Sequence, residues 1–189
     1  MTDDDLMTRY QEGDAAAFEM LFARHHQAVF NQARWLLGQT EEAEDAMQEA
    51  FLRLARAADR YEGRGLLRAY LLRITRNLCL NRRNHLELRP FASSGSTEVT
   101  PSEVMGPEPE PHERLEHRDR LRQLEGHLRE LPLRQQEALL LRVQEQLSYR
   151  EIALVLEVPL GTVKTLIHRA RGALARALED GSTEGANAL

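Results

Sequence analysis

The stretch SYREIALVLEVPLGTVKTLIHRAR, residues 148–171, decides the fold of the C-terminal part of the chain. It opens with the Ser-x-x-Glu pattern of a capping box, and Leu147 just before it can pack on Ile152 as a hydrophobic staple. A helix therefore starts here and ends just before residues 159–162, which open a second helix running to about Leu178. Two helices joined by so short a turn have helix-turn-helix spacing.

The outer face of the second of these helices is suited to DNA. Its core face is predicted to hold Val163, Ile167, Ala170, Leu174 and Leu178, and no acidic residue occurs between 161 and 178. Small residues near the helix start permit close approach to base edges, and cations further along neutralise phosphates. The candidate DNA contacts are Gly161, Thr162, Lys164, Thr165, His168, Arg169 and Arg171. The alternative is a helical hairpin with a solvated cationic face.

The rest of the chain also has helical periodicity, without strand-like alternation. One leucine stripe, followed by Pro132 and a helix from about Leu133 to Gln144, supports the helix-turn-helix; the stripe comprises Leu121, Leu124, Leu128 and Leu131. Near the N-terminus another stripe comprises Phe18, Leu21, Phe22, Val29, Ala33 and Leu36. His25 falls on this second stripe, and we expect it to be a hydrogen-bonded core histidine rather than a ligand.

Residues 41–58 form an amphipathic helix with an unusual polar side. Its buried stripe is Ala43, Ala46, Met47, Ala50, Phe51, Leu54 and Ala58. At 100° per residue, Asp45, Glu49, Leu52 and Arg56 lie together on the opposite side. An apolar leucine among charges favours a partner surface, although a solvated helix with one exposed leucine is the alternative.

A cationic helix follows, from about Leu66 to Asn84. Residues 60–84 contain seven basic residues and one acidic residue, whereas residues 1–59 contain five basic and twelve acidic ones. Leu67, Tyr70, Leu71, Ile74 and Leu78 are predicted to face inward, with Arg68, Arg76 and Arg83 outward and Arg73 and Asn77 flanking. The loop before the helix, RYEGRG at residues 60–65, carries Tyr61 and Arg64, which suit a strand with unstacked bases.

Composition defines the domain organisation. Residues 85–117 are rich in proline, serine and acid, which is typical of a flexible linker. We therefore predict an all-α protein with two small helical domains, residues 5–88 and 115–180, a flexible acidic linker at 89–114 and a tail at 181–189. The linker's acidity either mimics RNA or keeps the tether extended.

Several classes of function are excluded by what the sequence lacks. The chain of 189 residues has a net charge of −5, no long apolar run and an acidic start, so we expect no signal peptide, no membrane insertion and a cytoplasmic location. The single cysteine, Cys79, forms no internal disulfide and supplies no zinc knuckle. With no glycine-rich nucleotide loop and no HExxH, neither an enzyme, a metal site nor a cofactor is expected.

The motifs in this order resemble the sigma-70 family, extracytoplasmic-function (ECF) subgroup. GDAAAF (residues 13–18) and AEDAMQEAFL (43–52) are similar to the sigma-2 segment that engages the β′ clamp helices of core RNA polymerase. The resemblance implies that the core-binding residues are Asp45, Gln48, Glu49, Leu52 and Arg56. RAYLLRITRNL (68–78) is similar to the segment that melts and reads the minus-10 element. The implied DNA contacts there are Tyr61, Arg64, Arg68, Arg73, Arg76, Asn77, Arg82 and Arg83.

Residues 148–171 look like the sigma-4 helix-turn-helix, which reads the minus-35 element. The resemblance implies core polymerase (β′ clamp helices and β subunit), promoter DNA and an anti-sigma factor as partners. Leu166 stands where the family often has arginine, and Tyr70-Leu71 where it often has a Trp-Leu pair. A dimeric repressor is the main alternative, and it would bind duplex DNA tightly without polymerase.

Overall fold

The structure is a computed structural model that describes residues 1–87, 124 and 126–186. The chain divides into two compact units, Met1–Pro101 and Ser102–Leu189. Every regular element among the described residues is a helix, so the all-α prediction is confirmed. The predicted linker, residues 89–114, lies outside the described residues, and the domain bounds of 5–88 and 115–180 stay predictions.

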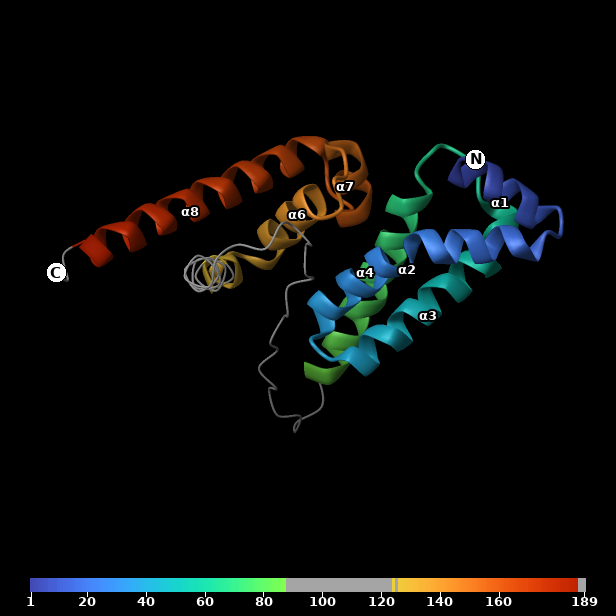
Figure 1. The fold of residues 1–189 in the computed structure, drawn as a ribbon, viewed down its shortest axis with the longest axis horizontal. Helices are drawn as coiled ribbons and strands as arrows, with labels where there is room; N and C mark the ends of the chain where they lie inside the picture. The colour runs from blue at the N-terminus through green and yellow to red at the C-terminus, as the bar shows by residue number, and fades with distance from the viewer. Residues whose placement is uncertain (88–123, 125, 187–189) are drawn as a thin grey trace, which may run out of the picture. The chain divides into compact units, whose positions relative to one another are not determined.

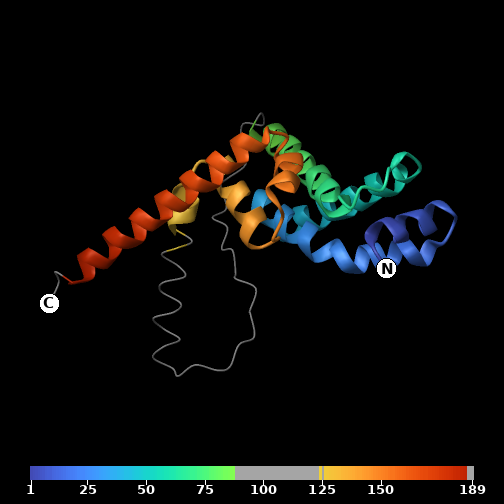
Figure 2. The same ribbon diagram turned by 90° about the horizontal axis from the view of Figure 1, so that it is seen from above.

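Three long helices build the described part of the first unit, with the short helix α1 packed against α2 (Figure 1). The helices α2, α3 and α4 pack against one another, and α1 folds back on α2 (Figure 2). The elements are α1 (Asp3–Gln11), α2 (Ala15–Leu37), α3 (Thr40–Arg56), the 3-10 helix η1 (Ala58–Arg60) and α4 (Leu67–Glu87).

The predicted apolar stripes of α2 and α3 form the core of this unit. Leu21, Val29, Ala33 and Leu36 of α2 are buried, as are Ala43, Ala46, Ala50, Phe51 and Leu54 of α3. Phe22 is an exception: it was predicted to be buried but is 38% exposed. Its ring stacks on the imidazole of His26 at 5.4 Å and tilts against Phe51 at 4.7 Å, so it lies at the edge of the core.

The sequence patterns did not reveal α1. Thr2 and Asp5 form a capping box at its start, and Leu6 and Met7 are buried completely or almost completely. Asp3 of this helix forms a hydrogen bond with His25, whose Nε2 lies 2.8 Å from Asp3 Oδ2. His25 is 5% exposed, so the prediction of a hydrogen-bonded core histidine is confirmed.

The buried side of α4 includes polar residues in addition to its predicted apolar stripe. Arg76, predicted to face outward, is only 7% exposed, and Thr75 is fully buried. The physical reason is that α4 packs against two helices, α2 and α3, so that more than one side of it is covered. Cys79 is also buried, and burial raises the pKa of its thiol to about 12, which keeps it protonated and unreactive.

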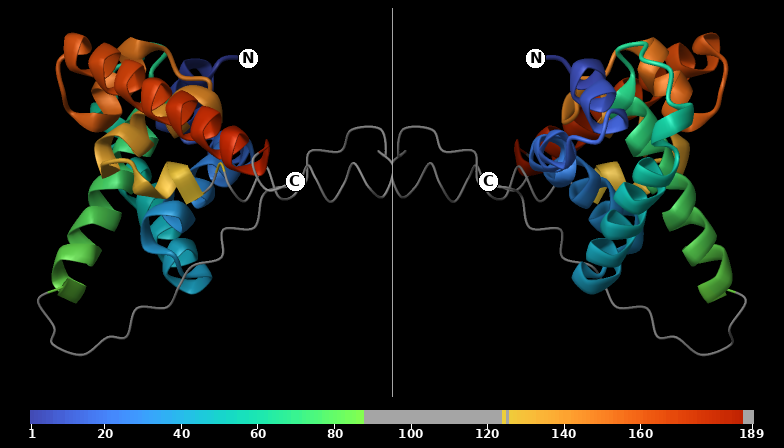
Figure 3. Two further views of the ribbon diagram at one scale, coloured as in Figure 1. Left: turned by 90° about the vertical axis from the view of Figure 1, so that its left-hand side faces the viewer. Right: turned by 90° about the vertical axis from the view of Figure 1, so that its right-hand side faces the viewer.

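The second unit contains the predicted helix-turn-helix. Its helices are α6 (Leu133–Val143), α7 (Tyr149–Leu156) and α8 (Leu160–Ala186), and residues 126–130 are also helical. The three labelled helices pack on one another, with α7 beside the first turns of α8 (Figure 3). Ile152, Val155, Val163, Ile167 and Ala170 are buried between them.

The helix α8 is longer than predicted, because it continues past Leu178 to Ala186. Its C-terminal part extends beyond α6 and α7 (Figure 1), and Leu178, predicted to be in the core, is 43% exposed. In the leucine stripe, Leu131 is buried and Leu128 packs on it, whereas Leu124 is 36% exposed. In the described part of the chain, no helix is long and apolar enough to cross a membrane.

Candidate nucleic-acid and partner interfaces

An open groove runs along the outer side of α3 where it meets α4. Four of the five predicted core-binding residues line this groove, which has a volume of about 480 Å³. Leu52 is 51% exposed, so the prediction of a leucine exposed among charges is confirmed. Arg56 is exposed further along α3 but does not line the groove. The full lining is Asp45, Gln48, Glu49, Leu52, Arg53, Leu78, Asn81 and Arg82.

Charges of both signs meet in this groove. Arg53 Nε donates a hydrogen bond to Glu49 Oε1 at 2.8 Å, one helical turn away on α3. This bond, reinforced by the charge of Arg53, lowers the pKa of the Glu49 carboxyl. The carboxylate therefore stays ionised at neutral pH. An apolar side chain between fixed charges gives a surface that can combine apolar burial with charge pairing.

Arg82 lines the groove and contacts α3. Its guanidinium donates to the backbone carbonyl of Glu42 on α3 at 3.0 Å. Arg82 follows Arg73 by nine residues, which places it half a turn away around the helix. The family resemblance implied that Arg82 contacts minus-10 DNA, and in the structure Arg82 lines the groove together with four of the predicted core-binding residues. Arg53, Leu78 and Asn81 also line the groove, and the sequence analysis missed them.

The other predicted minus-10 residues are distributed over α4 and the loop before it. Arg64 lies in the loop, is exposed and pairs with Glu62. Arg73 lies over the Tyr70 ring, 5.2 Å from its centroid. The half-buried members on α4 are Arg68, Arg73, Asn77 and Arg83, whereas Arg76 is buried.

Tyr61 is not a freely exposed stacking surface. Its hydroxyl donates to Asp4 Oδ1 at 3.0 Å, and its ring centroid lies 6.1 Å from that of Tyr70. Burial, together with the bond to Asp4, raises the pKa of Tyr61 far above its ordinary value. The phenol therefore stays a hydrogen-bond donor at every physiological pH.

The start of α7 has the predicted cap. Ser148 Oγ accepts a hydrogen bond from the Glu151 backbone N–H at 3.3 Å, and Glu151 Oε2 accepts one from the Ser148 N–H at 2.7 Å. Leu147 and Ile152 are both buried, in agreement with a hydrophobic staple. The turn into α8 passes through Glu157, whose backbone adopts the left-handed conformation with φ of 55°. The start and the end of α7 are thus both well defined.

The seven residues predicted to contact minus-35 DNA lie at the start and on the outer face of α8, and most of them are exposed. Six of the seven residues are exposed, and Thr162 is half-buried. A Cβ added at Gly161 would meet nothing within 4 Å, so this position leaves open space at the helix start. Thr165 Oγ1 donates to the Gly161 carbonyl at 3.1 Å. The exposed residues are Gly161, Lys164, Thr165, His168, Arg169 and Arg171.

The cap, the turn and this cationic face define the second unit as a helix-turn-helix. Comparison with known proteins identifies its family. The sigma-70 region 2 family matches residues 21–87, and the sigma-70 region 4 family matches residues 121–174. Together with ECF sigma factors that are at least 31% identical over more than nine-tenths of this chain, these matches show that the chain belongs to the ECF subgroup of the sigma-70 family.

The sequence similarity to known sigma factors extends over nearly the whole chain. RNA polymerase sigma-H factor of Pseudomonas aeruginosa is 31% identical over 184 residues, covering 94% of each chain. The ECF RNA polymerase sigma-E factor of Escherichia coli is 32% identical over 188 residues, covering 92% of this chain and 93% of its own. Among solved structures, CnrH in complex with the cytosolic domain of CnrY has a TM-score of 0.64 at 24% identity, covering 94% of this chain and 97% of its own, which supports the fold.

Proposed function

We propose that this protein binds core RNA polymerase and directs it to specific promoters. The observation that carries the proposal is the groove between α3 and α4, because residues assigned to core binding by family resemblance line one shared surface. Asp45, Glu49 and Leu52 then contact the β′ clamp helices, and Leu52 becomes buried on docking. The second unit adds contacts to the β subunit.

Promoter recognition is divided between the two units. The outer face of α8 reads the minus-35 element in the major groove, with Gly161 permitting close approach and Arg169 and Arg171 contacting phosphates. In the first unit, Arg64, Arg68, Arg73, Asn77 and Arg83 follow the backbone of the opened minus-10 strand. Arg76 belongs to this set only if its buried guanidinium turns outward.

The protein supplies binding energy and not chemistry. The polymerase performs nucleotidyl transfer, so this chain needs no cofactor and is not an enzyme. Its place of action is the cytoplasm, with the polymerase. An anti-sigma factor controls it by covering the polymerase-binding and DNA-binding surfaces. In support, the solved structure of the sigma factor RpoE from Bartonella quintana is a complex with the anti-sigma factor NepR. This RpoE has a TM-score of 0.64 against the present chain at 23% identity, and the match covers 86% of this chain and 96% of RpoE.

The test is transcription from a pool of promoter fragments by purified core polymerase, with and without this protein, followed by mapping of the RNA starts. We expect new starts that share a pair of upstream elements. Asp45→Lys and Glu49→Lys should abolish them, whereas Glu44→Lys should not, since Glu44 is exposed on the same helix but outside the groove. Specific duplex binding without core, and no new starts, would instead establish the dimeric repressor.

A further inference from the structure

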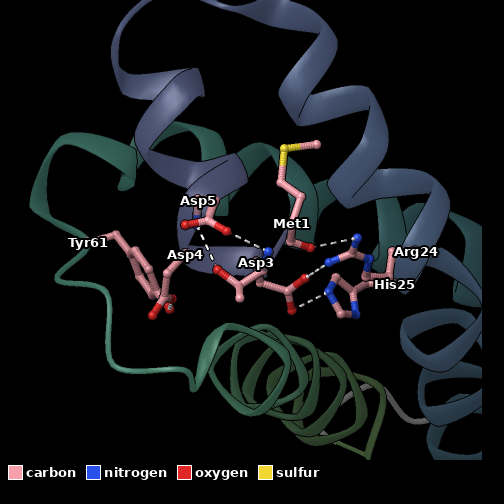
Figure 4. A network of polar contacts seen from close by, with 8 residues as sticks. Met1, Asp3, Asp4, Asp5, Arg24, His25 and Tyr61 are labelled. Carbon is pink, nitrogen blue, oxygen red and sulfur yellow. Dashed lines mark hydrogen bonds and ion pairs between the residues drawn. The ribbon is translucent and has the colours of Figure 1, made fainter.

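The loop that joins η1 to α4 lies against the first turn of α1. One carboxylate, that of Asp4, accepts hydrogen bonds from two points of this loop. Tyr61 Oη donates to Asp4 Oδ1 at 3.0 Å, and the backbone N–H of Gly65 donates to Asp4 Oδ2 at 2.7 Å. Figure 4 shows the Tyr61 ring beside the Asp4 carboxylate. The two donors are four residues apart, so Asp4 fixes both ends of the segment between them.

The loop backbone comes close to Asp4 as well. A Cβ placed on Gly63 would lie 3.1 Å from Asp4 Cγ, so a larger residue at position 63 would require the loop or the Asp4 side chain to shift by a few tenths of an ångström. Gly65 has a φ of +65°, a conformation that favours glycine. The two glycines therefore serve different purposes, close approach at one position and backbone geometry at the other.

Asp4 itself is held firmly by α1. The capping box of Thr2 and Asp5 closes the start of the helix, and Leu6 anchors it in the core. Asp3 pairs with Arg24 and His25 of α2 on the opposite side from Tyr61 (Figure 4). At the other end of α1, Gln11 Nε2 donates to the carbonyl of Ala58 at 2.7 Å. The helix thus provides a fixed support for the loop.

This loop leads directly to residues assigned to the opened strand. Arg64 lies between the two points held by Asp4, and its side chain is 71% exposed. Tyr61 lies beside Tyr70 of α4, and Tyr70 lies under Arg73. A displacement of Tyr61 would therefore reach Tyr70 and, through Tyr70, Arg73 of the candidate minus-10 surface.

We propose that Asp4 is a positioning residue for promoter opening, which holds the loop from Tyr61 to Gly65 in the conformation that captures the unpaired minus-10 strand. Asp4 does not touch the DNA. The inference rests on the proposed function, and it gives α1 a role that neither the sequence patterns nor the matched region 2 segment, which begins at residue 21, assigns to it.

Whether removal of the Asp4 carboxylate strengthens or weakens strand binding distinguishes a positioning role from simple charge repulsion. Removing an acidic charge near a DNA surface should strengthen binding to the phosphate backbone. Positioning predicts the opposite for Asp4. Asp59 is a matched control, because it is an exposed acidic residue of the adjacent η1 and is not among the partners of the loop.

The experiment measures binding of a fluorescent single-stranded oligonucleotide, carrying the non-template minus-10 sequence from the mapped starts, to polymerase assembled with each variant. We expect Asp4→Ala to weaken capture about ten-fold and Asp4→Asn to weaken it less, since the amide keeps one acceptor. Asp59→Asn should bind as tightly as the wild type or more tightly. Affinity for core and the unfolding temperature should change little in all three.

Tyr61→Phe keeps the ring and removes only the hydroxyl, so it tests the same contact with a milder change. It should also weaken capture, and combining it with Asp4→Ala should add nothing further. Unchanged or tighter capture by Asp4→Ala, additive effects of the two changes, or a parallel loss of core affinity would overturn the proposal. If Asp4→Ala does not fold, normal capture by Tyr61→Phe overturns it. Failure of the wild-type protein to bind core or start transcription is a separate result, which refutes the proposed function instead.

Discussion

Replacing Leu52 by alanine should weaken binding to core polymerase without destabilising the protein. Leu52 is 51% exposed, so about half of its apolar surface remains to be covered by a partner. The change removes three carbons, each worth about 0.8 kcal/mol when fully buried. Half of that total is about 1.2 kcal/mol, which corresponds to an affinity loss of about eight-fold.

The assay is fluorescence anisotropy of the labelled protein titrated with core polymerase. Met20→Ala is the matched control, because Met20 is 43% exposed on α2 and does not line the groove. Leu54→Ala is the contrasting variant, since Leu54 is fully buried and its truncation should cost about 2 to 5 kcal/mol of folding stability. Wild-type core affinity for Leu52→Ala, or equal losses for Leu52→Ala and Met20→Ala, would refute the assignment of the groove.

Three further predictions concern the cap, the recognition helix and the core histidine. Ser148→Ala should lower the free energy of unfolding of the second unit by about 1 kcal/mol, measured by denaturant titration. Arg171→Ala should reduce the slope of log affinity against log salt for minus-35 DNA by about one, whereas Arg176→Ala, further along α8, should leave it unchanged. Burial lowers the pKa of His25 in the folded state, so protonation favours unfolding and stability should fall as the pH drops through about 6.5 and below. Thermal unfolding at pH 7.5 and 5.5 should show a smaller pH effect for His25→Gln.

The sequence predicted those parts of the fold in which local signals and tertiary packing agree. The Ser148 cap is formed by two residues three apart, and the face of α8 follows a regular period, so both could be predicted without knowledge of neighbouring helices. The exposed position of Leu52 was predictable for the same reason, because α3 has a single buried stripe.

Packing determined the features that the sequence did not reveal. The helix α1 has only nine residues and three aspartates in its first turn, which resembles a solvated acidic segment, yet Leu6 and Met7 anchor it. Arg76 is buried because α4 contacts two helices, whereas Leu178, on the C-terminal part of α8, is 43% exposed. The contact between Asp4 and Tyr61 joins residues 57 positions apart, and no local pattern indicates it.

In the proposed function, the helix α4 connects the polymerase-binding groove with the residues that capture the opened strand. Arg82 on one side of it lines the groove, and Arg73, half a turn away around the helix, lies over Tyr70. A helix with its side chains is only about 10 Å across, so a partner bound in the groove fixes the position of the side that carries Arg73. Changes in the groove, such as Leu52→Ala, should therefore weaken strand capture only through lower core affinity, and saturating core should restore it. Changes at Asp4 should persist at saturating core, which distinguishes docking from positioning in one titration.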